Sequence, residues 1–129
     1  MRLTHVRLLA ADMEPMLAFY RDVLGLQVTL GAGDGIYYEL RAGDVILALY
    51  DRGLMGQMIG EELPAPARSD AVALTFAVDD VDDAVRALKG RGATLVNEPM
   101  DYAVAFLRVA HLRDPEGNLI EVNAPLDGV

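Results

Sequence analysis

One stretch near the C-terminal end reads Arg113-Asp114-Pro115-Glu116-Gly117-Asn118-Leu119-Ile120-Glu121-Val122, and the architecture of the chain is most readily inferred from it. Proline suits the second position of a tight turn and glycine the fourth, so Asp114–Gly117 predicts a turn between two strands. Beyond the turn, successive side chains of an extended strand point to opposite sides. Ile120 and Val122 therefore face one side of the sheet, and Glu121 faces the other.

The sequence around this hairpin predicts a strand, a helix and three strands. A strand at 72–78 is followed by Asp80, a suitable helix N-cap. Apolar residues then recur at helical spacing, at Val81, Ala84, Val85 and Leu88. Glycines at 90 and 92 end this helix, and extended segments are expected at 93–96, 105–112 and 118–123.

The first half of the chain predicts the same order of elements. A strand at 5–9 precedes the candidate N-cap Asp12, and a helical stripe runs from Met16 to Leu24 before the candidate C-cap Gly25. Strands are expected at 26–30, 36–41 and 45–50. The sequence therefore predicts an α+β fold of two βαβββ modules, which curl as half-barrels around a shared hollow. Their predicted bounds are 1–52 and 71–125, with a linker at 53–70.

Aligning the two halves relates polar residues of one half to residues of the other. Matching Asp12 with Asp80 places His5 on Ala73. Matching Leu40-Arg41 with Leu112-Arg113 places Glu39 on His111, and in the last strand of each half Ala48 falls on Glu121. Strand alternation then puts five polar residues on the concave, ligand-facing side of the sheets. These are His5, Arg7, Glu39, His111 and Glu121.

Composition limits the classes of function. The chain has 129 residues, no cysteine and a formal net charge of −9. Without cysteine there is no disulfide or thiolate site, and an acidic surface repels phosphate backbones, so nucleic-acid binding is not expected. No apolar run has the length of a membrane span, and no signal peptide is predicted. We expect a cytoplasmic protein of one domain.

The motifs Phe19-Tyr20-Arg21-Asp22-Val23-Leu24-Gly25-Leu26 and Asp114-Pro115-Glu116-Gly117-Asn118-Leu119-Ile120-Glu121 resemble those of the vicinal oxygen chelate superfamily. This superfamily includes glyoxalase I, bleomycin-resistance proteins and extradiol dioxygenases. The resemblance covers essentially the whole chain, and it implies paired βαβββ modules, a homodimer and a small-molecule ligand.

The resemblance also implies positions for a divalent metal ion, on the first and last strands of each module. His5 and Glu121 match two of these positions, whereas Ala48 and Ala73 stand at the other two. The ligand set is therefore incomplete, and two protein ligands rarely hold a divalent metal tightly.

The candidate site residues follow from these two lines of reasoning. Ligand contacts are predicted at His5, Arg7, Tyr37, Glu39, Phe106, His111 and Glu121, where the aromatic rings suit a planar substrate. Glu121 is the candidate catalytic residue, and Arg7 or Arg108 could neutralise its charge. The preferred function is small-molecule binding without a tightly held metal. The alternatives are a metal-dependent lyase, isomerase or dioxygenase, and a structural or regulatory dimer.

Overall fold

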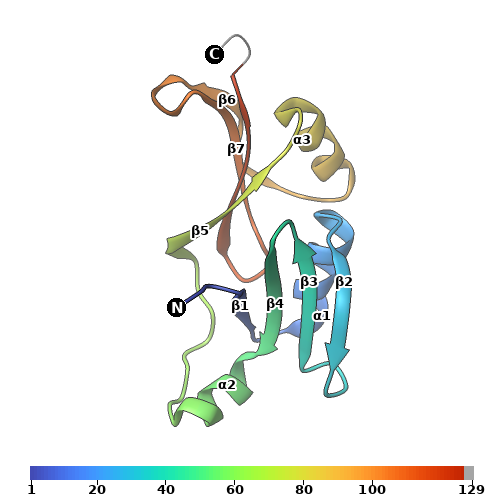
Figure 1. Cartoon of the computed structure of the whole chain (residues 1–129), viewed down its shortest axis with the longest axis vertical. Helices are drawn as coiled ribbons and strands as arrows, with labels where there is room; N and C mark the ends of the chain where they lie inside the picture. Colours follow the sequence, from blue (N-terminus) through green and yellow to red (C-terminus); the bar gives the residue numbers. More distant parts are fainter. Residues whose placement is uncertain (127–129) are drawn as a thin grey trace. The chain divides into compact units, whose positions relative to one another are not determined.

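The computed structural model describes residues 1–126 and confirms the predicted α+β fold with its repeated order of elements (Figure 1). The chain divides into two compact units, of which one spans Met1–Ala67 and the other begins at Arg68. The elements of the first unit are β1 (His5–Ala10), α1 (Met13–Ala18), η1 (Phe19–Val23), β2 (Gln27–Ala32), β3 (Tyr37–Ala42), β4 (Val45–Asp51) and α2 (Arg52–Ile59). Those of the second are β5 (Ser69–Ala77), α3 (Val81–Gly90), β6 (Leu95–Tyr102), η2 (Ala103–Ala105), β7 (Leu107–Arg113) and β8 (Asn118–Pro125).

Each unit contains one four-stranded sheet, and the two sheets have the same topology. The strand orders are β1-β4-β3-β2 and β5-β8-β7-β6, with the first strand of each unit parallel to the last. In each unit a helix packs on one face of the sheet, because α1 contacts β4 and α3 contacts β6, β7 and β8. The apolar core lies under these helices and includes Met16, Tyr20, Leu40, Leu49, Val81, Val85, Leu112 and Ile120. We call the opposite side of each sheet its open face.

The Asp114 carboxylate organises the turn between β7 and β8. Its side chain is 4% exposed and accepts hydrogen bonds from the backbone N–H groups of Glu116 at 2.9 Å and Asn118 at 3.0 Å. The Asn118 side-chain amide donates to the second oxygen at 2.7 Å. Gly117 adopts φ 91°, which a residue without a Cβ tolerates at little cost. The predicted turn is therefore held together by hydrogen bonds to its own first residue, Asp114.

Helix formation differs between the two units. Asp80 caps α3 by accepting from the Asp83 N–H at 2.8 Å, as its position predicts. In the first unit the predicted single helix is interrupted, because α1 ends at Ala18 and the chain continues as the π-helix η1. Such single π turns are rare and often occur near functional sites. The apolar stripe did not reveal this change of hydrogen-bonding pattern.

The register of the strands confirms the predicted alignment of the two halves. Ala48 pairs with Glu39, and Glu121 pairs with His111 at the equivalent place in the second sheet. Ile46 and Leu119 lie two residues before Ala48 and Glu121 on these strands. Ile46 pairs with His5 of β1, and Leu119 pairs with Ala73 of β5. His5 is therefore equivalent to Ala73, and Ala48 is equivalent to Glu121.

We expect the Asp114 turn to contribute strongly to stability. Replacing Asp114 with Ala removes the acceptor of three partly buried hydrogen bonds, which should lower the free energy of unfolding by about 2–3 kcal/mol. Asp114→Asn keeps one carbonyl acceptor and should lose less. Urea denaturation of both variants checks this, and equal loss in the two would contradict the assigned roles.

Candidate functional site

The first unit gathers its polar residues around Glu39 on the open face of the sheet. His5 Nε2 lies 3.1 Å from Glu39 Oε2, and the Tyr37 hydroxyl donates to the same oxygen at 2.5 Å. The side chain of Glu39 is 17% exposed and that of His5 is 29% exposed. A carboxylate this well covered needs hydrogen-bond donors, and adjacent strands supply them.

These contacts fix the ionisation of Glu39. The Tyr37 hydrogen bond, together with the weaker effects of His5 and Arg7, holds the pKa of Glu39 below its usual value despite partial burial. An ionised Glu39 only accepts hydrogen bonds, so His5 donates from Nε2. The other ring nitrogen of His5, Nδ1, lies 2.8 Å from the Thr4 hydroxyl, which can donate to it.

Arg7 and two tyrosines extend this cluster along the open face. The Arg7 guanidinium lies 5.4 Å from the centroid of the Tyr37 ring, within the range of a cation–π contact. The Tyr37 and Tyr50 rings meet edge to face, with centroids 5.8 Å apart. Ala48 is fully buried between the paired positions of Arg7 and Glu39. The first unit thus carries the Arg7 cation, the Glu39 carboxylate and an aromatic surface on the same face.

The second unit gathers a chain of four polar residues on its open face. His111 Nε2 lies 2.8 Å from Glu121 Oε1, and the Asn123 amide donates to Glu121 Oε2 at 2.8 Å. On the other side of the imidazole, Nδ1 lies 2.7 Å from Asn97 Oδ1. The Asn97 amide nitrogen donates to the Glu98 carbonyl at 3.1 Å, which turns Oδ1 toward His111. The histidine is held between an amide oxygen and a carboxyl group.

Asn97 and Asn123 were not predicted from the sequence. Asn123 follows Glu121 by two residues, so strand alternation already places both on one face. Asn97 lies in β6, whose pairing with β7 shifts register on both sides of it. Those irregularities cannot be read from the apolar pattern, and they determine which side chains of β6 share the face of His111.

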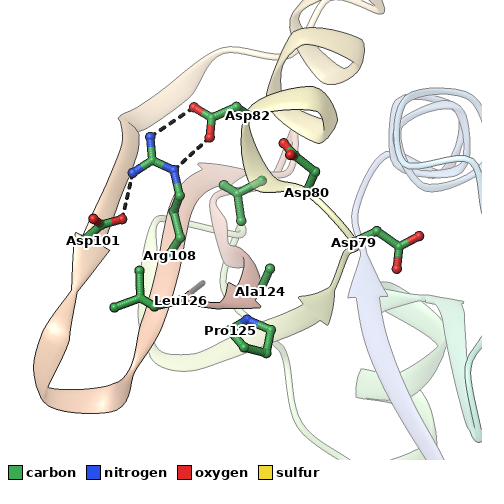
Figure 2. A pocket seen from close by; sticks show the side chains of 9 residues that line it. Asp79, Asp80, Asp82, Asp101, Arg108, Ala124, Pro125 and Leu126 are labelled. Carbon is green, nitrogen blue, oxygen red and sulfur yellow. Dashed lines mark hydrogen bonds and ion pairs between the residues drawn. The ribbon is translucent and has the colours of Figure 1, made fainter. Parts of the chain in front are cut away.

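Arg108 does not neutralise Glu121, contrary to one of the predicted options. It lies on the helix side of the sheet, where its Nε and Nη2 donate to both oxygens of Asp82 at 2.7 and 3.0 Å. A third bond at 2.8 Å joins its Nη1 to Asp101. Figure 2 shows this arginine joining α3 to β6 at the edge of a pocket of about 260 Å³. The arginine holds the pKa of Asp82 below its usual value.

Phe106 lies away from both polar clusters. It follows η2 in the connection between β6 and β7, has φ 57° and is 59% exposed. Its carbonyl accepts the Leu126 N–H at 3.0 Å. Of the seven predicted ligand contacts, His5, Arg7, Tyr37 and Glu39 lie together in the first unit, and His111 and Glu121 lie together in the second.

Comparison with known proteins identifies the family. The model of the Glyoxalase/Bleomycin resistance protein/Dioxygenase superfamily matches residues 2–122. The chain belongs to this superfamily. It is 36% identical over 125 residues to the uncharacterized protein YraH of Bacillus subtilis, covering 95% of this chain and 97% of that protein.

Two solved structures illustrate the likeness. A glyoxalase/bleomycin resistance protein/dioxygenase from Nocardioides is 26% identical with a TM-score of 0.81, covering 99% of this chain and 85% of that one. TnmS3, an antibiotic-binding protein from Streptomyces, is 23% identical with a TM-score of 0.72, covering 97% of this chain and 96% of that one. Because the sequence identity to TnmS3 is only 23%, this match shows that the two proteins share a fold and nothing more.

The donor set does not fit the divalent metal of glyoxalase-like superfamily members. The register places Ala48 and Ala73 at two of the four ligand positions, and alanine has no donor atom. His5 uses Nε2 to donate to Glu39, so that nitrogen offers no lone pair to a metal. Among residues 1–126, no three His, Asp or Glu side chains form a group that could hold a metal ion. The same residues include no helix long and apolar enough to cross a membrane.

The hydrogen bond from Tyr37 makes a testable contribution to the ionisation of Glu39. Tyr37→Phe removes the largest influence that lowers the Glu39 pKa, so this pKa should rise toward its ordinary value. Because the pKa is depressed in the folded state, Glu39 stabilises the fold above its unfolded pKa, and this contribution is lost as pH falls through the folded pKa. Carboxyl carbon NMR titration measures the shift. Tyr50→Phe is the control, since Tyr50 makes a ring contact with Tyr37, and an unchanged Glu39 pKa in Tyr37→Phe would contradict the assignment.

Proposed function

We propose that this superfamily member binds a small organic molecule on the open faces of its sheets, without a tightly held metal. The observation that supports it most directly is the state of Glu39. Its carboxylate is ionised and 17% exposed, yet both of its side-chain hydrogen bonds among the described residues fall on Oε2. Oε1 therefore remains available to accept a hydrogen bond from a ligand.

The neighbouring residues add the other features of a ligand site. Arg7 and Tyr37 present a cation stacked on an aromatic ring beside Glu39. On its own open face, the second unit separately offers the carboxyl group of Glu121 beside His111. Small-molecule sites typically combine apolar and aromatic surface with a few oriented polar groups. The antibiotic-binding protein among the structural neighbours has this fold, so the scaffold is compatible with such a role. As the resemblance implies, we also propose a homodimer.

The alternative is a metal-dependent lyase, isomerase or dioxygenase. In such an enzyme a metal would polarise vicinal oxygens of the substrate, and Glu121 would be a ligand or a base. The two alanines and the internal hydrogen bond of His5 disfavour it. Binding that survives chelation distinguishes the two functions.

Thermal-shift screening of chelator-treated protein against aromatic and amine-bearing metabolites tests the proposal. A ligand present at 100 times its Kd should stabilise the native state by about 2.7 kcal/mol and raise Tm. Glu39→Gln should reduce the shift for a ligand of the first unit and Glu121→Gln that for a ligand of the second, whereas Glu62→Gln, at an exposed carboxylate outside both clusters, should reduce neither. Failure of every compound to raise Tm, or shifts that require added metal, would contradict metal-free binding.

A further inference from the structure

The open face of the second unit changes from polar to apolar along its strands. The first cross-strand row contains Asn97, His111, Glu121 and Thr75, paired in that order across β6, β7, β8 and β5. The next row contains Met100, Val109, Asn123 and Ala77, and the third contains Tyr102, Leu107 and Pro125. Directly paired residues point to the same side of a sheet, so all three rows lie on one face.

A bulge in β6 creates this arrangement. Asn97 pairs with His111 and Met100 pairs with Val109, so three residues of β6 span two of β7. The extra residue falls beside Pro99, which lacks the N–H that regular pairing would use. Without the bulge, strict alternation would put Asp101 on the open face and Met100 and Tyr102 under the helix. With it, Asp101 meets Arg108 on the helix side and the two apolar side chains stay outside.

The apolar side chains contributed by β6 are exposed to an unusual degree. Met100 is 46% exposed and Tyr102 is 50% exposed, although Val109 beneath them is only 5% exposed. Methionine adapts its shape to flat ligands, and a tyrosine ring provides a stacking surface. Beside them, the carboxyl group of Glu121 is held in place by His111 and Asn123 and has a side chain that is 23% exposed.

We propose that the ligand of this face is a planar, largely apolar molecule with one hydrogen-bond donor, which Glu121 accepts while the ring system covers Met100 and Tyr102. This inference rests on the proposed function and names the chemical class of its ligand. Rows two residues apart are separated by about 7 Å at 3.3–3.4 Å per residue. Because β6 lies two strands from β8, the Met100 backbone is also about 9.5 Å across from that of Glu121. A two-ring compound that lies diagonally over Val109, with its hydroxyl group at Glu121, therefore reaches the Met100 side chain, and a longer one reaches Tyr102.

Three probes of similar size test the proposal by NMR titration of chelator-treated protein. The probe 2-naphthol is planar and has a donor, 2-methoxynaphthalene is planar without one, and decahydro-2-naphthol has a donor without planarity. We expect 2-naphthol to bind about tenfold more tightly than either analogue, as one hydrogen bond to a charged group and one aromatic contact each allow. Shifted resonances should map to β6, β7 and β8.

Variants assign the two parts of the site. Glu121→Gln should weaken 2-naphthol about tenfold and leave 2-methoxynaphthalene unchanged, because only the first probe donates to the carboxylate. Met100→Ala should weaken both planar probes and not decahydro-2-naphthol, because a two-ring compound reaches the Met100 row and its flat face contacts the thioether. Val104→Ala is the control, since Val104 is 81% exposed near the same strand end but outside the three rows. Met100 is 46% exposed, so its variant tests the proposal even if Glu121→Gln unfolds.

Three results would overturn the inference. One is equal binding of all three probes, and another is planar-probe binding that is unaffected in both variants. The third is a change of oligomeric state in Met100→Ala, measured by sedimentation velocity, without any change in probe affinity. That result would assign this surface to protein association. If metabolites of another class bind while these probes do not, the proposed function stands and the ligand class is wrong.

Discussion

The structure depends on a constraint that applies to both sheets, namely that a partly buried carboxylate on the open face must find its hydrogen-bond donors nearby. Glu39 obtains them from Tyr37 and His5, and Glu121 accepts from Asn123 and lies 2.8 Å from His111 Nε2. Because desolvating an unpaired charge is costly, these donors determine where the carboxylates point. The bond to Glu39 engages Nε2 of His5, so this nitrogen offers no lone pair to a metal.

The two units show how a duplicated scaffold can carry different chemistry. Equivalent positions hold Ala48 and Glu121 on the last strand, and Glu39 and His111 on the strand beside it. On its open face each unit therefore pairs an imidazole with a glutamate, but on different pairs of strands. The first unit adds a cation–π pair, and the second adds two amides and an apolar surface. The fold is conserved between the units, and the polar groups are not interchangeable.

The sequence predicts the architecture because the repeat and its turns have strong local causes. Asp114, Gly117 and Asp80 perform the roles that their residue types suggest, and matching the halves correctly relates Glu39 to His111 and Ala48 to Glu121. What the sequence does not reveal are register shifts. The bulges of β6 change which side chains share a face, so Asn97, Met100 and Tyr102 were not assigned to the surface around His111. Likewise, Arg108 pairs with Asp82 of α3 rather than with Glu121, because a side chain of that length can choose among several carboxylates.

The most direct test is a calorimetric metal titration of chelator-stripped protein. It measures whether His5 and the two glutamates are engaged by hydrogen bonds within the protein rather than by a metal ion. With His5 donating to Glu39 and alanine at two ligand positions, Zn²⁺ or Ni²⁺ should bind without a tight stoichiometric site, and His5→Ala and Glu121→Ala should give the same isotherm as the native chain. One equivalent of tightly bound metal that disappears in both variants would contradict this and would favour the metal-dependent enzyme.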